Sequence, residues 1–394
     1  MLKNLLKIFN IIYPLADFLY ILQLEEYETK RYFKRLKRFY WKRDLQKRGK
    51  LIYTKRIKIT LLLAMPFGLI TPPLTPLWVG ISNFILNPYF SNIKTNIQKR
   101  AADYFSKHNA KTKVIAIAGS YGKTTTKNYI YELIRYNYKT QMIPGNINTS
   151  TGIANWVLEK FNSSSKILIV EVDSYFIGEI AKSLKITPPD IAILTNVGDQ
   201  HLERLVTKQN LSKALHEVFE FAKHNALKIT GKKSSLEYAL QVAKILKVPQ
   251  DIIDDTIKKL TPPDRRRNLI KINGFDVIDD SYNISEITAK EGIWYAKNYS
   301  KNNNKKLIVI TAGIPELGFE NRNGNIHLGQ MLNKYAQKII LLNSTLASEV
   351  EKGIGNKNLI IRSDSMYDAL ETAKQFDPEK YLILMQPELN DLYF

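Results

Sequence analysis

The sequence predicts an α/β protein built from three parts, and three observations lead to this prediction. The parts are an N-terminal helical, membrane-associated segment (residues 1–110), a central domain with a mainly parallel sheet (111–262) and a C-terminal Rossmann-like α/β domain (263–394). First, 394 residues are more than one hydrophobic core usually organises. Second, the basic charge is concentrated near the N-terminus. Third, short apolar runs alternate with helical patterns from Lys113 onward, as in parallel sheets.

The composition excludes several classes of protein. With 44% hydrophobic and 24% charged residues, the chain can bury large cores, so wholesale disorder is excluded. The absence of cysteine excludes disulfide frameworks, thiolate zinc sites, iron–sulfur ligation and cysteine nucleophiles. Five histidines leave little room for a histidine-rich metal site.

The net charge of the chain is +21, from 58 Lys and Arg and 37 Asp and Glu. Residues 1–113 hold 22 of these cations and 6 of the anions, so this segment carries +16. Fourteen cations lie between Lys30 and Lys58, directly before a stretch, 59–93, that has no charged residue. A basic run is typical of binding to nucleic acid or to an anionic membrane. Beside an apolar stretch it favours membrane lipids, so no nucleic-acid partner is expected.

The apolar stretch 59–93 is longer than the roughly 20 residues that a membrane-spanning helix needs. Prolines at 72, 73 and 76 break its middle, and Pro66 interrupts its first half. We therefore expect an apolar helical hairpin or a re-entrant loop in preference to a single span. Basic residues on both sides place both ends at the cytoplasmic face of the cell membrane. The alternative interpretation is a buried helical hairpin of a soluble domain.

A second apolar segment, Leu2–Leu24, precedes the basic run. Pro14 and Asp17 interrupt it, and it lacks a small-residue cleavage site. We therefore predict an interfacial segment, in preference to a cleaved signal peptide.

The run KVIAIAG, followed by SYGKTTTK and a helical pattern, predicts a strand, a glycine-rich loop and a helix, which is the context of a phosphate-binding P-loop. Gly119 and Gly122 let backbone N–H groups face phosphate oxygens, and the helix beginning near Lys123 adds its positive dipole end. Lys123 would bridge the β and γ phosphates of a nucleotide, and the Thr124 hydroxyl would bind Mg²⁺. The spacing departs from the common form, because Ile117 occupies the outer glycine position.

Two later segments place polar residues after apolar runs. Glu171 ends the run in KILIVEVDSY, and Asn196 and His201 follow the run in DIAILTNVGDQH. In a parallel sheet these positions lie at the carboxyl ends of strands, where the ligand crevice forms. Glu171 could hold the Mg²⁺ of bound ATP, and His201 could bind a second ion or contact substrate. The alternatives are an ordinary strand-terminal carboxylate and a surface histidine that begins a helix.

Six ordered motifs carry a resemblance to a known family: GSYGKTTTK, PGNINTSTGI, IVEVDSY, ILTNVGDQHLER, PPDRRRNLIKINGFDVIDDSYN and TAGIPELG. From about Lys113 to the C-terminus the chain resembles the Mur ligase family, and within it the members that add D-alanyl-D-alanine to a muramoyl tripeptide. The resemblance implies an ATP-dependent, ADP-forming amide ligase of cell-wall (peptidoglycan) precursor type. In this reaction ATP phosphorylates a carboxylate, and an amine attacks the acyl phosphate.

The resemblance also implies roles for individual residues. Arg265 resembles an arginine that reaches the ATP γ-phosphate from the next domain, although Arg266 or Arg267 could fill that role, and a solvated basic cluster is the alternative. Asp280 resembles the carboxylate that binds the ribose hydroxyls, with Asn283 nearby. The implied catalytic residues are Lys123, His201 and Arg265, and the implied Mg²⁺ ligands are Thr124, Glu171 and His201. The implied ATP-binding residues are Gly119, Ser120, Tyr121, Gly122, Lys123, Thr124, Thr125, Asn196, Asp280 and Asn283.

Three departures from the family make the substrate less certain than ATP. Leu215 stands where many members carry a carbamylated, metal-bridging lysine, although Glu217 is kept and Lys213 lies close by. Between Phe221 and Gly231 the chain passes directly from one helical pattern to the next, which indicates that the family's usual intervening strands are deleted. The membrane segment takes the place of a soluble domain for a UDP-sugar. A hinge is expected near Leu260–Asp264, where prolines interrupt the helical pattern.

The expected partners are a cell-wall precursor peptide or a lipid-linked acceptor, an amino acid or dipeptide as the amine, and membrane lipids at the N-terminus. Two other functions remain open. One is a folylpolyglutamate synthase-like ligase, which the DDSYN and ELG motifs disfavour. The other is a catalytically weakened nucleotide-binding membrane protein, which Leu215 and the apparent deletion suggest.

Overall fold

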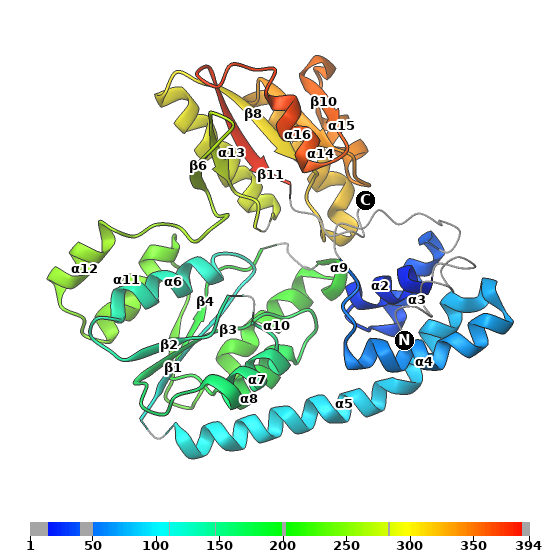
Figure 1. Cartoon of the computed structure of the whole chain (residues 1–394). Helices are drawn as coiled ribbons and strands as arrows, with labels where there is room; N and C mark the ends of the chain where they lie inside the picture. Colours follow the sequence, from blue (N-terminus) through cyan, green and yellow to red (C-terminus); the bar gives the residue numbers. More distant parts are fainter. Residues whose placement is uncertain are drawn as a thin grey trace. The chain divides into compact units, whose positions relative to one another are not determined.

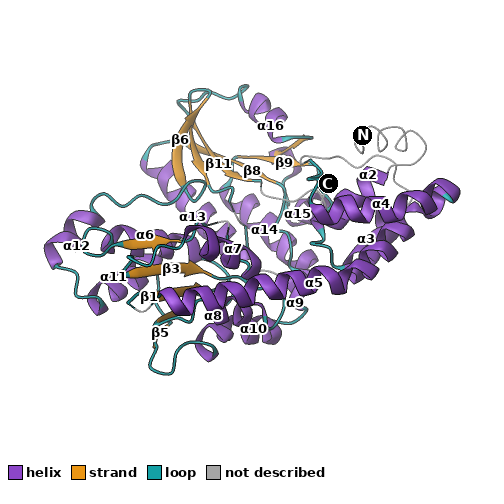
Figure 2. Cartoon of the chain, turned by 60° about the horizontal axis from the view of Figure 1, so that its bottom comes forward, coloured by secondary structure: helices purple, strands orange, loops and turns teal. Residues whose placement is uncertain are grey.

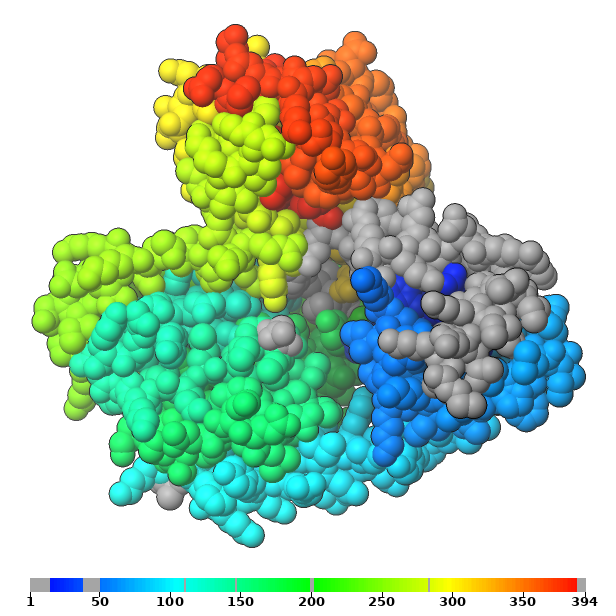
Figure 3. Space-filling view, in the orientation of Figure 1, coloured from blue at the N-terminus to red at the C-terminus, as the bar shows by residue number. Residues whose placement is uncertain are grey.

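The computed structural model describes residues 15–39, 50–109, 111–145, 147–198, 202–282 and 284–387; the other residues are grey in Figure 3. The chain forms two compact units. The first extends to Asn96 and the second begins at Ile97, so the division falls inside the long helix α5 (Thr75–His108).

The described part of the first unit is helical. It contains α2 (Leu15–Leu24), α3 (Thr29–Phe39), α4 (Lys55–Ile70), the 3-10 turn η1 (Pro72–Leu74) and the first part of α5 (Figure 1). Its core includes Leu19 of α2, Leu61 of α4 and Val79 of α5, all with no exposed area. The prediction of an interfacial segment is therefore wrong for residues 15–24, because α2 packs its apolar side chains into this core. Residues 2–14 lie outside the described residues.

Helices α4 and α5 form the predicted helical hairpin, with the prolines at 72, 73 and 76 at its turn. The rings of Phe67 and Trp78 stack across the hairpin, with centroids 4.8 Å apart. The interruption expected at Pro66 is wrong: α4 continues through this residue, because packing of its inner face holds the helix on both sides of the missing N–H. No helix in the described segments has the length and apolar character needed to cross a membrane.

The second unit begins with a parallel sheet of five strands, in the order β2-β3-β1-β4-β5. The strands are β1 (Lys113–Ala118), β2 (Thr140–Met142), β3 (Ile167–Glu171), β4 (Ile191–Leu194) and β5 (Leu227–Ile229). Central strand β1 pairs with β3 and β4, and Ile117 lies opposite Glu171 on one side and Ile193 on the other. The carboxyl ends of these three strands therefore meet at one edge.

Helices cover both faces of this sheet (Figure 2). One face packs against α7 (Ser150–Lys160), α8 (Glu179–Ile186), α10 (Lys208–Glu220) and the end of α5. The other packs against α6 (Lys123–Ile134), α11 (Ser235–Ile245) and α12 (Gln250–Ile257). Because both faces are covered, the three inner strands β1, β3 and β4 are mainly apolar runs, as the sequence indicates.

The C-terminal part contains a second sheet, with the order β10-β9-β8-β11-β7-β6. Strands β7 to β11 pair in parallel, and only β6 and β7 are antiparallel. This arrangement confirms the prediction of a partly parallel α/β domain. The strands are β6 (Asn268–Ile272), β7 (Phe275–Asp279), β8 (Lys306–Thr311), β9 (Lys338–Leu342), β10 (Ile360–Ser363) and β11 (Tyr381–Gln386).

The helices of this part pack mainly on one face of the sheet. Buried residues of α13, α14 and α15 share a core with alternate residues of β8, β9 and β11. The elements are α13 (Glu286–Asn302), η2 (Gly318–Glu320), α14 (Asn321–Tyr335), α15 (Ala347–Gly353), η3 (Lys357–Leu359) and α16 (Met366–Ala373).

The segment between Phe221 and Gly231 differs from its prediction. The three-residue strand β5 lies there and pairs in parallel with β4, so the direct passage between two helices is wrong. Its residues LKI are too few, and too exposed at the first two positions, to produce a clear strand pattern. Within the segment Leu260–Asp264, where a hinge is expected, residues 260–263 have no regular structure and Asp264 begins a turn.

Candidate active site

The loop between β1 and α6 has the backbone conformation of an anion-binding turn. Gly119 and Gly122 have φ angles of +145° and +82°, which favour glycine. A Cβ atom at Gly119 would lie 2.0 Å from Thr195 Oγ1, so β4 and the loop can approach only because Gly119 lacks a side chain. The Ser120 N–H donates to the Asn196 carbonyl over 2.7 Å, which joins the loop to the end of β4.

The side chains of Ser120 and Tyr121 are used to hold this loop against the segment that follows β4. The Ser120 hydroxyl accepts a hydrogen bond from the Gly198 N–H at 3.0 Å. The Tyr121 ring lies so close to Gly198 that a Cβ there would be 3.1 Å from it. Burial raises the pKa of Tyr121. Both the hydroxyl and the N–H group of Ser120 therefore hold the loop against this segment.

Lys123 is the first residue of α6 and is buried at the loop. Its ammonium group donates to the Gly119 carbonyl at 2.5 Å and pairs with the Asp173 carboxylate at 3.3 Å. Asp173 follows β3 two residues after Glu171, and it was not among the predicted site residues. The structure therefore places the predicted phosphate lysine at the loop, beside a second carboxylate.

Thr124 and Glu171 come together as predicted. The Thr124 hydroxyl lies 3.0 Å from each carboxylate oxygen of Glu171. These are hard oxygen ligands, which Mg²⁺ prefers, and Mg²⁺ needs few protein ligands because it keeps several waters. The residues present therefore fit a Mg²⁺ ion that bound phosphates would also ligate. Within the described ranges there is no group of three His, Cys, Asp or Glu side chains that could hold a metal, and His201 lies outside those ranges.

Lys127 is a site residue that the sequence analysis missed. It lies one turn after Lys123 on α6 and has no exposed area. Its ammonium group pairs with Glu171 at 2.9 Å and donates to the Ile143 carbonyl at 3.1 Å. Burial lowers the pKa of Lys127, and the Glu171 carboxylate opposes that effect. The i, i+4 spacing from Lys123 was the one available signal, because it places both lysines on the same side of α6.

The three arginines of the PPDRRR motif have different partners. Arg265 donates to the hydroxyl and the carbonyl of Ser281, at 3.0 and 2.9 Å. Arg267 pairs with Glu291. Arg266 lies over the Tyr282 ring at 4.2 Å and interacts electrostatically with Glu171 of the central sheet.

Arg266 is therefore a candidate for an arginine whose charge acts on Glu171 at the candidate metal site. Burial lowers the pKa of Arg266, and the negative charge of Glu171 opposes this. The side chain of Arg265 instead ties the segment before β6 to the segment after β7.

Asp280 lies just after β7, and burial raises the pKa of its carboxyl group. Its Oδ2 atom accepts a hydrogen bond from Gln386 Nε2 at 3.0 Å. Helix α13 approaches this carboxylate at Gly292, where a Cβ would lie 2.4 Å from Asp280 Oδ2. Asn283 lies outside the described residues.

Leu215 and Glu217 have structural partners. Leu215 is 1% exposed and belongs to the core between α10 and the central sheet. Glu217 accepts hydrogen bonds from the N–H groups of Gly178 and Ala181, so it caps the N-terminus of α8. Lys213 is exposed on the same helix. This packing supports the interpretation of Leu215 as a core residue.

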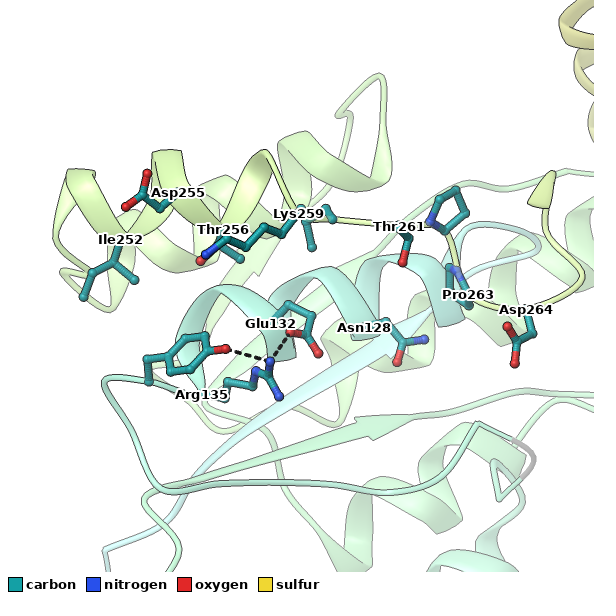
Figure 4. A pocket seen from close by; sticks show the side chains of 13 residues that line it. Asn128, Glu132, Arg135, Ile252, Asp255, Thr256, Lys259, Thr261, Pro263 and Asp264 are labelled. Atoms are coloured by element: carbon teal, nitrogen blue, oxygen red, sulfur yellow. Dashed lines mark hydrogen bonds and ion pairs between the residues drawn. The ribbon is translucent and has the colours of Figure 1, made fainter. Parts of the chain in front are cut away.

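A pocket of about 770 Å³ lies between α6, α12 and the segment 260–264 (Figure 4). Asn128 and Glu132 of α6 face it, with Asp255 of α12 and Lys259, just after α12, on the other side. None of the predicted site residues lines this pocket. The predicted nucleotide site is therefore a separate place, at the edge of the central sheet.

Comparison with known protein families finds a match for the central part of the chain. Residues 117–253 match the Mur ligase middle domain. This segment is a Mur ligase middle domain. It contains the glycine-rich loop, Lys127, Glu171 and Asn196, and Arg266 and Asp280 lie beyond it.

Curated relatives of the chain carry the names of muramoyl peptide ligases. Over 118 residues the chain is 30% identical to UDP-N-acetylmuramoyl-tripeptide--D-alanyl-D-alanine ligase of Bacillus subtilis, and over 153 residues it is 29% identical to the enzyme of that name from Rickettsia prowazekii. These matches cover 30% and 39% of this chain. The chain spans only 26% and 33% of the lengths of these relatives.

Solved structures extend the likeness of the fold beyond the middle domain. MurF ligase from Thermotoga maritima, in complex with ADP, has a TM-score of 0.66 and 22% identity and covers 75% of this chain and 80% of that chain. FolC from Escherichia coli, in complex with DHPP and ADP, has a TM-score of 0.53 and 13% identity and covers 75% of this chain and 90% of that chain. The fold of the second unit is therefore that of the Mur ligases.

Proposed function

We propose that the chain is an ATP-dependent, ADP-forming amide ligase that acts on a peptidoglycan precursor through an acyl phosphate. The observation that carries this proposal is the group of charges at the edge of the central sheet. Lys123, Lys127 and Glu171 lie there around Thr124, and Arg266 acts on Glu171 from the C-terminal part. Phosphoryl transfer needs cations placed around the phosphates, and little other protein chemistry.

In this proposal the loop 119–122 presents backbone N–H groups to the phosphates, and Lys123 balances the charge between the β and γ positions. Thr124 and Glu171 would hold Mg²⁺, which supplies charge neutralisation when it is bound. Arg266 stabilises the negative charge that develops on the transferred group, a role that the sequence assigned first to Arg265. Asp280 would accept hydrogen bonds from the ribose hydroxyls. His201 and Asn283 stay as predicted contacts of metal and nucleotide.

The proposed substrates follow from the names of the relatives. We propose a muramoyl tripeptide, carried on UDP or on a lipid, as the acceptor, and D-alanyl-D-alanine or a similar dipeptide or amino acid as the amine. The match to the Mur ligase middle domain covers residues 117–253, which include the glycine-rich loop and Glu171, and this supports the ATP-dependent step more directly than it supports the acceptor.

The experiment that tests this function measures ADP release by the purified chain. We expect ADP release only when ATP, Mg²⁺, a muramoyl tripeptide acceptor and D-alanyl-D-alanine are all present. Release that needs dihydropteroate and glutamate instead would favour the FolC-like alternative. ATP binding without release under any combination would favour a catalytically weakened nucleotide-binding protein. A Lys123→Ala variant that keeps wild-type turnover would contradict the role of the loop.

We also propose that the chain works at the cytoplasmic face of the cell membrane. The support is the excess of Lys and Arg before residue 113, on both sides of an apolar stretch. Fractionation of cells that express the full chain tests this, with the pellet of sedimented membranes as the expected location. Recovery of the chain from the supernatant at low ionic strength would contradict it.

A further inference from the structure

The helical hairpin of the first unit exposes large apolar side chains along much of its length. We call the exposed set the hairpin face. On α4 it consists of Leu62, Leu63, Phe67, Leu69 and Ile70, and on η1 and α5 it consists of Leu74, Leu77, Ile81, Phe84 and Ile85. Ile70, Phe84 and Ile85 are 79%, 65% and 64% exposed. Monomeric soluble proteins rarely expose so many apolar side chains on one feature.

The hairpin face is separate from the core of its unit. On α4 the inward residues Ile57, Leu61 and Ala64 have no exposed area, whereas Leu62 and Leu63, which lie between Leu61 and Ala64 along the helix, are exposed. A helix packed on one side of a soluble protein has polar residues on its other side. Residues 59–93 contain no charged residue, so the exposed side of this hairpin carries large apolar side chains and no charge.

Cations lie at the base of the hairpin, away from its turn. Lys55 and Lys58 are exposed at the start of α4, and Lys94 is exposed where α5 leaves the apolar stretch. Three further exposed lysines, Lys30, Lys34 and Lys37, occur at helical spacing on α3. An apolar face beside exposed lysines is complementary to a membrane surface, which combines acyl chains with anionic headgroups.

The base of the hairpin is held by buried polar contacts. Arg56 donates to the side-chain oxygens of Asn83 and Asn87, and Asn83 donates to the Thr29 hydroxyl at 2.8 Å. Burial lowers the pKa of Arg56 to about 10. The inward cation therefore serves the structure of the unit, whereas the lysines at the base of the hairpin are exposed.

The length of the apolar arm matches half of a bilayer. From Lys58 to Ile70, α4 rises by about 18 Å at roughly 1.5 Å per residue. One leaflet contributes about 15 Å to the roughly 30 Å hydrocarbon core. An arm of this length reaches the middle of the bilayer when Lys55, Lys58 and Lys94 are at the headgroups.

We propose that the hairpin face inserts into one leaflet of an anionic phospholipid bilayer, with the turn at η1 near the bilayer midplane and the basal lysines on the headgroups. This surface is independent of the ligase site, because its residues belong to the first unit and the site residues belong to the second. Insertion would hold the ligase domain close to a membrane-bound substrate.

Vesicle flotation of the full chain tests the proposal. We expect the chain to float with vesicles of phosphatidylcholine and phosphatidylglycerol, and less with phosphatidylcholine alone. Phe84→Gln with Ile85→Gln should lower the bound fraction by about tenfold or more, because two exposed apolar side chains are lost. The matched control is Tyr136→Gln with Tyr367→Gln, two side chains of the second unit that are 69% and 72% exposed.

Several outcomes would overturn the proposal. One is that the wild-type chain floats with neither type of vesicle. Another is that the control variant loses as much vesicle binding as Phe84→Gln with Ile85→Gln. A wild-type dimer in light scattering, which Phe84→Gln with Ile85→Gln converts to a monomer without changing flotation, would instead assign the face to a second copy of the chain. ADP release by the variant in the absence of vesicles is measured in parallel, so that failure of the membrane surface and failure of the ligase function are distinguished.

The absence of natural cysteine allows the depth of insertion to be measured with one label. A nitrobenzoxadiazole fluorophore on Leu74→Cys reports on the turn, and one on Tyr367→Cys is the control. In one leaflet, the label at residue 74 should shift its emission to the blue and be protected from dithionite on both sides of the bilayer. Reduction of this label by dithionite trapped in the vesicle lumen would show that the hairpin crosses the bilayer and would overturn the proposal.

Discussion

At the scale of the residue, the candidate site depends on a buried pair of opposite charges. Lys127 and Glu171 are both buried, and each would be costly to bury alone. Beside this pair, the Lys127 ammonium group also donates to the Ile143 carbonyl. The Glu171 carboxylate also accepts a hydrogen bond from the Thr124 hydroxyl. Lys127 therefore acts as a positioning residue that orients the proposed metal ligand.

Replacing Lys127 by methionine tests this positioning role. We expect the Mg²⁺ concentration for half-maximal ADP release to rise by about tenfold, because loss of a partner behind a metal ligand usually weakens metal binding by that order. The rate at saturating Mg²⁺ should change less. Lys127→Arg, which keeps the charge, should recover part of the affinity. A Mg²⁺ requirement that falls would show that removing the repulsion between two cations outweighs the loss of orientation.

The arginine of the C-terminal part can be identified by comparing two neighbours. We expect Arg266→Gln to reduce turnover by about a thousandfold, the order found for arginines that stabilise phosphoryl transfer. Arg265→Gln should reduce it by less than about tenfold, because Arg265 contacts Ser281 and not the central sheet. Steady-state turnover at saturating ATP is the measurement. The reverse order of effects would return the role to Arg265.

At the scale of the element, α10 connects the core to the helix beside it. Leu215 packs in the core. Glu217, two residues later, caps α8 by accepting a hydrogen bond from Gly178, which precedes it by 39 residues in the sequence. Both side chains are buried, so this face of α10 packs against the rest of the domain. A metal-bridging lysine at position 215 would have to displace core packing.

Replacing Leu215 by lysine therefore tests structure against metal binding. We expect a loss of about 3 kcal/mol or more in the free energy of unfolding, because a charge replaces a buried apolar group. The Mg²⁺ dependence of ADP release should not tighten. His216→Lys, at an exposed neighbouring position, is the matched control and should change stability little. A stable Leu215→Lys variant with a lower Mg²⁺ requirement would support a second metal site.

At the scale of the whole molecule, α5 belongs to both compact units. Its residues from Ile97 onward pack on the central sheet, where Ala101 and Phe105 have no exposed area. The Phe105 and Phe161 rings lie 4.8 Å apart. A truncation that removes residues 1–110 would therefore remove part of the core of the second unit.

We expect residues 97–394 to form a soluble protein that binds ATP, and residues 111–394 to have a lower melting temperature. The loss of Phe105 alone should cost about 3–5 kcal/mol. Thermal unfolding of the two truncated chains measures the difference, with Phe105→Ala in the full chain as a check on its origin. Equal melting temperatures would show that the end of α5 does not stabilise the second unit.

The sequence alone predicted the fold class, the strands that flank the site and the glycine-rich loop. These features come from local patterns: β-branched runs, glycines at positions of positive φ and a helix that begins at Lys123. Lys123 and Thr124 could be predicted because they begin the helix after the glycine-rich loop, and Glu171 because parallel strands end at one edge. The hairpin was predicted for a similar reason, since prolines and an uncharged stretch are visible in the chain itself.

Only the tertiary structure decided which side chains meet. Lys127 pairs with Glu171, Arg266 lies over the Tyr282 ring, and Glu217 caps a helix far away in the sequence. It also placed α2 in a core and left the hairpin face exposed. The physical reason is that burial and pairing of charges depend on residues brought together by folding. A sequence pattern indicates which face of its helix or strand a residue occupies. Only the packed structure determines which residue lies opposite that face.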